Sequence, residues 1–318
     1  MACPALAQWR WTPEARRLVR VRPELATTPE EQLVRADQLY RDGDYRKAQA
    51  AYTRFLDYFP DRPEVDRVQF SIAECYEARG KLKTASEEFR KLIANHRDSE
   101  YYDRVVQKQY DIAEQFYKQY TGRHGFGRLF AGRYLKRAIS VYEWLIENDP
   151  FGDATAEAQY RLAECKFAQG SFDEARFEYQ RVLDQFPASR WASSALYDVA
   201  ICDYRQSKTA RYDQDKTKNA LKGFQTFINS AGSDPRLDKA RSYVKQLRER
   251  LAEHEYLVAK FYERQERARA ALISYRRLTD RYPETSWAEK SQTAIGRLEK
   301  EAATIDRIAP GMTEHSTG

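Results

Sequence analysis

Histidine and cysteine are the residues of this 318-residue chain with the greatest potential for catalysis or metal binding. The histidines form no HExxH or HxxxH pair, and the cysteines show no CxxC spacing. Such spacings are what bring several ligands within reach of one metal ion. The sequence therefore predicts neither a metal site nor a bound cofactor.

The motifs of phosphate-binding and nucleophilic enzymes are missing as well. The glycine-rich segment TGRHGFG, which begins at Thr121, lacks the GK[ST] ending through which a P-loop holds phosphate and magnesium. No GxSxG motif occurs. Adjacent acidic pairs such as Glu87 and Glu88 point apart on a helix, which is typical of a solvated face. We therefore predict no catalytic residues and no enzyme activity; an enzyme-associated regulatory subunit or a cryptic hydrolase is the alternative from another class.

The charge pattern argues against nucleic acid as a partner. The chain has 54 basic and 48 acidic residues, a net charge of +6, and the two signs are interleaved. Interleaving is typical of solvated helix faces. The mean hydropathy is −0.83, and no stretch is long and apolar enough to cross a bilayer. Membrane contact is expected only through a lipid anchor or a partner.

One spacing template recurs six times: an alanine, an aromatic residue four places on and an apolar residue at seven. In four copies a proline follows at twelve, and these copies begin at Ala48, Ala138, Ala175 and Ala271; the two copies without it begin at Ala85 and Ala220. Offsets of four and seven put the apolar side chains on one helix face, and the proline ends that helix.

A second helix precedes each of these, marked by its own alanine with a bulky apolar residue three places before it. The alanines are Ala36, Ala73, Ala113, Ala163, Ala200 and Ala259. Gly43, Gly80 and Gly170 lie seven residues after such an alanine, where the chain must turn. Small residues at both alanine positions let paired helices approach closely. This spacing resembles the tetratricopeptide repeat (TPR).

The resemblance implies an all-α fold, a right-handed superhelical solenoid of about six TPR helical hairpins plus a closing C-terminal helix. We expect an extended segment over 1–29, one solenoid over 30–305 and a flexible tail over 306–318. The expected repeat units are 30–60, 63–97, 99–150, 152–187, 189–232 and 235–283, followed by a closing helix over 286–305.

Three irregularities interrupt the array. Thr121 to Arg133 is an insert that reads either as a disordered loop or as a contact with a partner or membrane surface through Phe126 and Phe130. A shorter insert lies around Thr209 to Thr217, and Pro235 to Glu263 is expected to form one unusually long helix. Cysteines two residues after three of the first-helix alanines are predicted to be buried packing residues: Cys75, Cys165 and Cys202.

The first helices of such a solenoid line its groove. Carboxylates and aromatic residues lie one and four places after the first-helix alanines, and the candidate peptide-binding residues are Asp37, Tyr40, Glu74, Glu77, Glu114, Tyr117, Glu164, Phe167 and Tyr204. Aromatic rings give contact area at little entropic cost, and carboxylates can accept backbone amides of an extended peptide. A second set, hereafter the wedge aromatics, is expected either to add aromatic steps to this groove or simply to wedge between neighbouring first helices: Phe70, Tyr110, Tyr160 and Tyr197.

The segment Arg250 to Tyr262 (RLAEHEYLVAKFY), with RYPET from Arg281, resembles the BamD family, the tetratricopeptide lipoproteins of the outer-membrane β-barrel assembly machinery. The resemblance implies a periplasmic scaffold that holds unfolded barrel substrates in its N-terminal groove. It also implies docking of the barrel subunit BamA through the C-terminal repeats. The candidate docking residues, which crowd that end of the chain, are Arg264, Arg267, Arg269 and Arg276; a solvated face is the alternative.

The first eight residues, MACPALAQ, read like the end of an export signal. Ala5 to Ala7 fits a signal-peptidase site, and Ala2 with Cys3 fits the end of a lipobox, which would make Cys3 the lipidated residue. With a start upstream of Met1 the protein is expected on the periplasmic side of the outer membrane, and with Met1 as the true start in the cytoplasm. The alternatives in function are a periplasmic envelope-coordination protein resembling TolA-binding factors and a generic protein-protein interaction adaptor.

Overall fold

A computed structural model of the chain describes residues 8–12, 17–21, 28–123, 131–152, 154–207 and 214–308, with side chains between 28 and 301 of those ranges. The chain divides into two compact units, Met1–Cys165 and Lys166–Gly318, which are described separately. Whether they form one continuous solenoid stays a prediction. Cys3, Phe126 and Phe130 lie outside the described residues.

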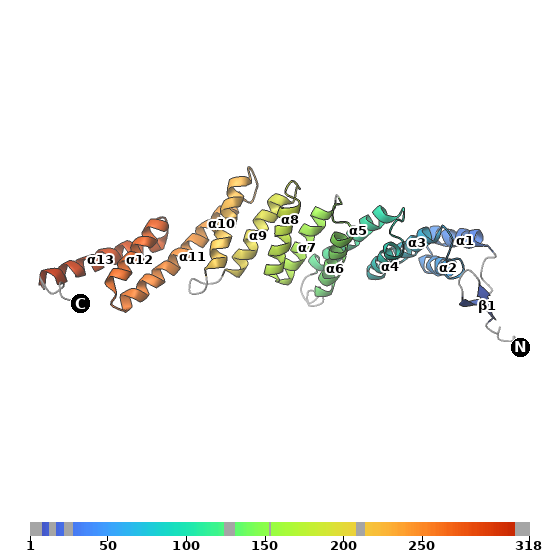
Figure 1. Cartoon of the computed structure of the whole chain (residues 1–318), viewed down its shortest axis with the longest axis horizontal. Coiled ribbons are helices and arrows are strands. Elements are labelled where there is room, and N and C mark those ends of the chain that lie inside the picture. Colours follow the sequence, from blue (N-terminus) through green and yellow to red (C-terminus); the bar gives the residue numbers. More distant parts are fainter. Residues whose placement is uncertain are drawn as a thin grey trace, which may run out of the picture. The chain divides into compact units, whose positions relative to one another are not determined.

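The first unit carries two strands and a run of helices (Figure 1). The elements are β1 (Gln8–Thr12), β2 (Arg17–Val21), α1 (Pro29–Arg41), α2 (Tyr45–Tyr58), α3 (Val65–Ala78), α4 (Leu82–Asn95), α5 (Tyr102–Thr121), α6 (Gly132–Asn148) and α7 (Thr155–Gln169), the last of which reaches into the second unit. Helices α1 to α6 pack on one another in succession, from α1 with α2 through to α5 with α6. This is the succession of helical hairpins that the spacing template predicts.

The second unit continues with helices alone among its described residues. They are α8 (Phe172–Gln185), α9 (Ala192–Gln206), α10 (Asp215–Ser230), α11 (Leu237–Arg264), α12 (Ala268–Arg281) and α13 (Ser286–Ile308). Consecutive helices again pack on one another, and α13 contacts both α11 and α12. The long helix expected over 235–263 is α11, with 28 residues, and the closing helix is α13. The all-α tetratricopeptide class is thus confirmed.

The strands β1 and β2 add a detail to the extended segment expected before the repeats. They pair in antiparallel register, with Gln8 opposite Val21 and Thr12 opposite Arg17. The segment is therefore not simply a linker, because its two described stretches form a two-stranded sheet.

The marker residues of the template form the core. All twelve marker alanines, two in each of six repeats, have no exposed surface: Ala36, Ala48, Ala73, Ala85, Ala113, Ala138, Ala163, Ala175, Ala200, Ala220, Ala259 and Ala271. Side chains of this size allow paired helix backbones to approach, and the larger Phe55, Phe89, Tyr142 and Tyr275 fill the remaining space.

The four helices that the template follows with a proline end two residues before it. Helices α2, α6, α8 and α12 end at Tyr58, Asn148, Gln185 and Arg281, each two residues before a proline. In each case the N–H of the intervening residue still donates to the carbonyl four residues back, as Phe59 does to Phe55 at 2.8 Å. Proline has no N–H with which to continue the ladder, although α4 and α10 end at the equivalent residues Asn95 and Ser230 without one.

In four of the six hairpins the turn uses one backbone position in the left-handed region. It lies seven residues after the first-helix alanine, where Gly43, Gly80 and Gly170 have φ of 78°, 67° and 85°. In the last hairpin Glu266 occupies this position with φ of 57°. A side chain in this conformation is strained, whereas glycine is not.

The cysteines and the wedge aromatics lie inside the hairpin stacks. Cys75, Cys165 and Cys202 are buried free thiols. Burial raises the pKa of both Cys75 and Cys202 to about 12, so these thiols stay protonated and unreactive at neutral pH. Three of the four wedge aromatics are buried, namely Phe70, Tyr160 and Tyr197, while Tyr110 is half-buried.

Glutamine four residues before the first-helix alanine is a repeated feature that the template did not include. Gln32 donates to the carbonyl of Ala51 at 2.8 Å, and Gln109 donates to that of Ser86 at 2.8 Å. Gln69 and Gln159 occupy the same position and are buried. The amides of Gln32 and Gln109 satisfy backbone carbonyls across a helix pair, which explains a polar side chain in the core at these positions.

Candidate functional site: the exposed surface of the first helices

The nine candidate groove residues all lie half-buried on the first helices of the hairpins. In the first unit, Asp37 and Tyr40 lie on α1, Glu74 and Glu77 on α3, Glu114 and Tyr117 on α5, and Glu164 on α7; in the second, Phe167 lies on α7 and Tyr204 on α9. Half-burial is what a groove-lining side chain requires, because it must be both held in place and accessible.

Basic residues that the sequence analysis did not single out bind the carboxylates of the first unit. Arg67 on α3 forms an ion pair with Asp37 on α1. Lys108 on α5 reaches back to α3, with its Nζ 2.8 Å from Glu77 and 3.7 Å from Glu74. Each cation therefore links its own helix to the first helix of the preceding repeat.

The third link of this kind is Arg161 on α7. Its guanidinium lies 3.3 Å from Glu114 on α5, 2.7 Å from Glu164 and 3.7 Å from Glu157. These carboxylates hold the pKa of Arg161 above its usual value although burial acts in the opposite direction. Asp37, Glu77 and Glu114 with Arg67, Lys108 and Arg161 are hereafter the ion ladder.

Two carboxylates of the ion ladder also accept hydrogen bonds from tyrosines on the second helices. The hydroxyl of Tyr52 on α2 donates to Asp37 at 2.5 Å, and that of Tyr142 on α6 donates to Glu114 at 2.6 Å. Both carboxylates are thus already engaged within the chain. The surface that remains for a ligand in the first unit is mainly aromatic.

Burial has changed the proton affinity of several groups on this surface. It raises the pKa of Tyr40 to about 12, with added repulsion from Glu74. Burial also raises the pKa of Glu74 and of Glu164, although Lys108 and Arg161 oppose the shifts. Tyr40 and Tyr117 therefore remain neutral hydrogen-bond donors at physiological pH.

In the second unit the two candidate aromatics are packed against neighbouring rings. Phe167 lies 5.1 Å from Phe172, centroid to centroid. Tyr204 lies 4.5 Å from Tyr243 and donates its hydroxyl to Gln246 on α11 at 2.8 Å. Tyr204 is therefore committed to the contact between α9 and α11 as much as to any groove.

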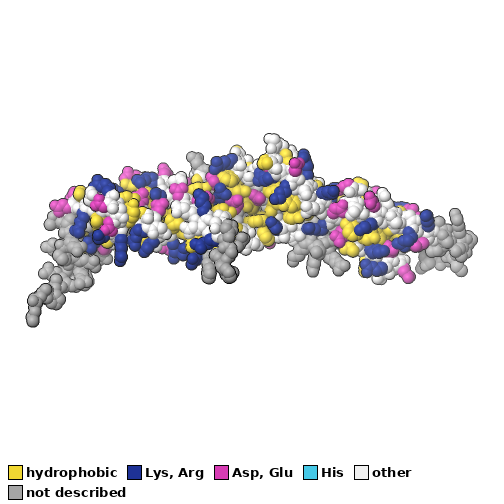
Figure 2. All heavy atoms as spheres, turned by 180° about the vertical axis from the view of Figure 1, so that it is seen from behind, with side chains coloured by type: hydrophobic (Ala, Val, Ile, Leu, Met, Phe, Trp, Pro, Cys, Tyr) yellow, Lys and Arg dark blue, Asp and Glu magenta, His cyan; other side chains and the backbone are white. Residues whose placement is uncertain are grey.

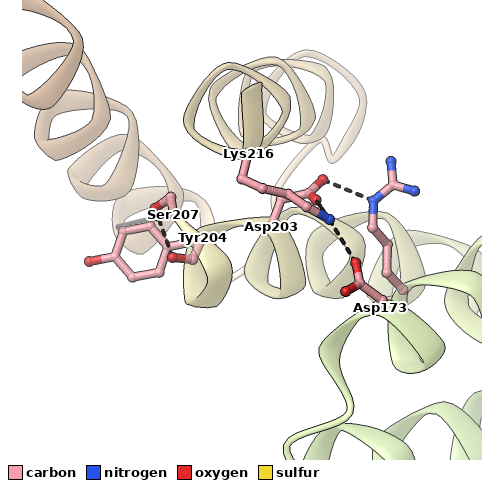
Figure 3. A network of polar contacts seen from close by, with 6 residues as sticks. Asp173, Asp203, Tyr204, Ser207 and Lys216 are labelled. Atoms are coloured by element: carbon pink, nitrogen blue, oxygen red, sulfur yellow. Dashed lines mark hydrogen bonds and ion pairs between the residues drawn. The ribbon is translucent and has the colours of Figure 1, made fainter. Parts of the chain in front are cut away.

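A polar network beside Tyr204 joins three helices of the second unit (Figure 3). Asp203 on α9 has a side chain only 2% exposed and accepts from Nε of Arg176 on α8 at 3.0 Å. Lys216 on α10 lies 3.6 Å from Asp203 and 2.7 Å from Asp173 on α8. Two cations and two carboxylates therefore hold α8, α9 and α10 together.

The candidate docking residues crowd the hairpin of α11 and α12 in the second unit, and all four are exposed. Arg276 forms an ion pair with Glu299 at 2.6 Å. Arg264, Arg267 and Arg269 form no ion pair with any residue of the described ranges, and they are hereafter the basic turn. Beside Arg276, a shallow groove of about 520 Å³ is lined by Ile273, Arg277, Asp280 and Arg281.

The described residues hold no cluster of three side chains able to bind a metal ion. Among the described helices, none combines the length and apolar character required to cross a membrane.

Two family models match the sequence. The model for the tetratricopeptide repeat matches residues 33–100, and the model described as outer membrane lipoprotein, YfiO, matches residues 122–303. No curated protein matches.

Solved structures of other TPR proteins are similar in fold. A thermophilic TPR protein of Thermus thermophilus is 19% identical and covers 68% of this chain and 99% of its own, with a TM-score of 0.35. A TPR protein of Parabacteroides merdae is 13% identical and covers 86% and 100%, with a TM-score of 0.36. YrrB, described as a TPR protein with an unusual peptide-binding site, is 15% identical and covers 68% and 92%, with a TM-score of 0.34.

The family matches support a protein-interaction scaffold with protein partners and an outer-membrane-associated location. The YfiO match spans more than half of the chain. The protein therefore belongs to the YfiO outer membrane lipoprotein family, the BamD-type TPR family that its Arg250 to Tyr262 segment resembles.

Proposed function

We propose that this protein is a non-catalytic scaffold of the outer-membrane β-barrel assembly machinery, acting on the periplasmic side of the outer membrane. It docks a BamA-type barrel subunit through its last hairpin and holds unfolded barrel segments on the first-helix surface of its first unit. The family match over residues 122–303 supports this role. The tetratricopeptide fold supports it too, because stacked hairpins offer an extended surface to a partner.

The observation that carries the docking role is the basic turn. Arg264, Arg267 and Arg269 are exposed, and none of them forms an ion pair with a described residue. Apolar surface lies on the same two helices, since Phe261 is 56% exposed and Ile273 67% exposed. Unpaired arginines next to exposed apolar side chains fit an acidic protein segment with an apolar anchor.

The observation behind the substrate role is the engagement of the groove carboxylates. Because the ion ladder and the tyrosines Tyr52 and Tyr142 already occupy them, a ligand on this surface meets aromatic faces such as those of Tyr40 and Tyr117. An unfolded barrel segment alternates apolar and polar side chains. Its apolar side chains can pack on these rings, which favours binding that depends little on the sequence of the segment.

Affinity capture from a detergent extract of outer membranes tests the docking role. The full chain should recover a BamA-type barrel subunit, and the triple variant Arg264→Gln, Arg267→Gln, Arg269→Gln should recover it about tenfold less, since each exposed charge contributes several tenths of a kcal/mol or more.

A charge-matched control keeps this test specific. The triple variant Lys222→Gln, Lys239→Gln, Lys245→Gln removes the same charge from exposed positions on α10 and α11 of the same unit. It should recover the barrel subunit as the unchanged protein does. Equal loss in both triple variants, or capture of soluble proteins alone, contradicts the docking role.

A further inference from the structure

Three arginines converge on one tyrosine where α5 ends and α6 begins, in the first unit. The guanidinium carbons of Arg123, Arg133 and Arg137 lie 4.5, 5.0 and 5.9 Å from the centre of the Tyr134 ring. Arg123 and Arg133 also donate to the Tyr134 hydroxyl oxygen, at 2.9 and 3.2 Å. Arg123 and Arg133 lie within the insert of Thr121 to Arg133, and Tyr134 and Arg137 follow it on α6; the family role does not explain this cluster.

No described carboxylate balances the positive charge of this cluster. No carboxylate of the described residues forms an ion pair with Arg123, Arg133 or Arg137, in contrast to Arg67 and Arg161 of the ion ladder. The intervening residues 124–130 have the sequence HGFGRLF, which contains no acidic side chain. Like charges held this close repel one another unless a counter-charge is bound.

The N-terminus of α6 adds to the positive electrostatic potential of the three arginines. It begins at Gly132 without an acidic residue in its first turn, and its capping residue Ala131 makes no side-chain hydrogen bond. The positive end of a 17-residue helix therefore lies beside Arg133 and Tyr134 without a neutralising group. In addition, Nε of Arg123 is buried and has no hydrogen-bond partner among the described atoms.

We propose that Arg123, Arg133, Tyr134 and Arg137 form a binding site for a phosphate group, carried by a lipid headgroup or free in solution. Three guanidinium groups offer more donors and more charge than one carboxylate can use, whereas a phosphate has several equivalent oxygens and up to two negative charges. The Tyr134 oxygen accepts from two arginines, so its own hydrogen is free to donate to the bound anion.

The surroundings agree with this assignment. Hydrogen bonding from Arg133 and the nearby guanidinium charges lower the pKa of Tyr134, the direction expected in a strongly positive field. Arg137 lies 5.7 Å over the ring of Phe116, so its side chain is held in place on α6. The space-filling view shows Lys and Arg side chains gathered along one edge of the N-terminal half (Figure 2).

Binding of inorganic phosphate to the full chain, measured calorimetrically at constant ionic strength with chloride as the balancing anion, tests the site. Arg133→Gln combined with Arg137→Gln should weaken binding about tenfold or more, because each removes charge-assisted hydrogen bonds. Tyr134→Phe keeps the ring that the arginines stack on and should weaken binding about threefold. Far-ultraviolet circular dichroism and thermal melting confirm that each variant is folded.

Lys136→Gln is the matched control, because Lys136 is exposed on the first turns of α6 and lies outside the cluster. It removes one positive charge and should change phosphate binding by less than about twofold. Co-sedimentation with phosphatidylglycerol vesicles, repeated with the same variants, identifies the source of the group.

Loss of vesicle binding in the arginine variants assigns a lipid headgroup, and phosphate binding without vesicle binding assigns a free phosphate. The proposal is overturned if neither probe binds, if Lys136→Gln weakens binding as much as the arginine variants, or if poly-glutamate binds at these arginines while phosphate does not.

Discussion

Glu266 is a non-glycine residue at a turn position that glycine occupies in three other hairpins. Its φ of 57° lies where Gly43, Gly80 and Gly170 are found in equivalent turns. A non-glycine residue in this region costs about 1–2 kcal/mol, and glycine loses about 0.4–1 kcal/mol more conformational entropy on folding. Glu266→Gly should therefore raise the free energy of unfolding by about 0.5–1 kcal/mol, measured by urea denaturation.

Gln265 provides the control for this prediction. It precedes Glu266 with φ of −89°, a conformation that any residue adopts. Gln265→Gly should lower the stability slightly, because it adds only freedom to the unfolded chain. If both glycine variants shift the denaturation midpoint in the same direction, strain at Glu266 is not the explanation.

The side chains on the first-helix surface were predictable from the repeat, but their partners were not. Position within the repeat places Asp37, Glu74 and Glu114 on this face, because helical periodicity decides it. The cations that bind these carboxylates lie on the first helix of the following repeat, but at different positions relative to its marker alanine. Arg67, Lys108 and Arg161 precede that alanine by six, five and two residues, respectively. Long arginine and lysine side chains can reach the same carboxylate from several positions on a helix. A template with fixed spacings therefore cannot detect these cations, because their position in the repeat varies.

Close approach of α9 and α10 depends on one glycine. A Cβ atom added to Gly223 would lie 2.8 Å from the Cβ of Ala200 on α9. Gly223→Ala should therefore push the two helices apart and lower the free energy of unfolding by about 1–3 kcal/mol. Chemical denaturation of the purified variant measures this loss.

Gly296 on α13 is the matched control, because an added Cβ there meets no atom within 4 Å. Gly296→Ala should increase stability by about 0.5–1 kcal/mol, the usual helix preference for alanine. Stabilisation in both variants would show that α9 and α10 have room to accommodate a methyl group.

Helix positions were the most predictable elements. The template placed the ends of the second helices, which lie ten residues after the marker alanine both in α2, α6, α8 and α12, where a proline follows, and in α4 and α10, where none does. The pairing of β1 with β2 was not predicted. Strand pairing depends on contacts between separate segments, and these short segments lie outside the repeat on which the alignment rested.

At the scale of the whole chain, the expected behaviour is that of stacked repeats, which transmit a local loss of stability only to their neighbours. Asp203→Asn leaves the charges of Arg176 and Lys216 without their buried partner. This substitution should lower the free energy of unfolding by about 2 kcal/mol. The loss is smaller than for a fully buried ion pair, because both cations are partly exposed. Amide hydrogen exchange followed by mass spectrometry should show faster exchange in α8 to α10 and unchanged exchange in α1 to α3.

Asp238→Asn serves as the reference variant, because the Asp238 side chain is 93% exposed on α11. It should alter exchange in none of these helices by a measurable amount. An equal acceleration in α1 and in α9 after Asp203→Asn would mean that the chain unfolds as one cooperative body.

The ion ladder has a fixed polarity: the acid belongs to the earlier helix and the base to the later one at each described step. If the hairpin of α3 and α4 were deleted, Lys108 would come to face Asp37, and a complementary pair would form again. If a hairpin were duplicated, the basic residue of the added first helix would likewise face the acidic residue of the first helix before it. An array built in this way can gain or lose members during evolution without creating a clash of like charges at the new junction.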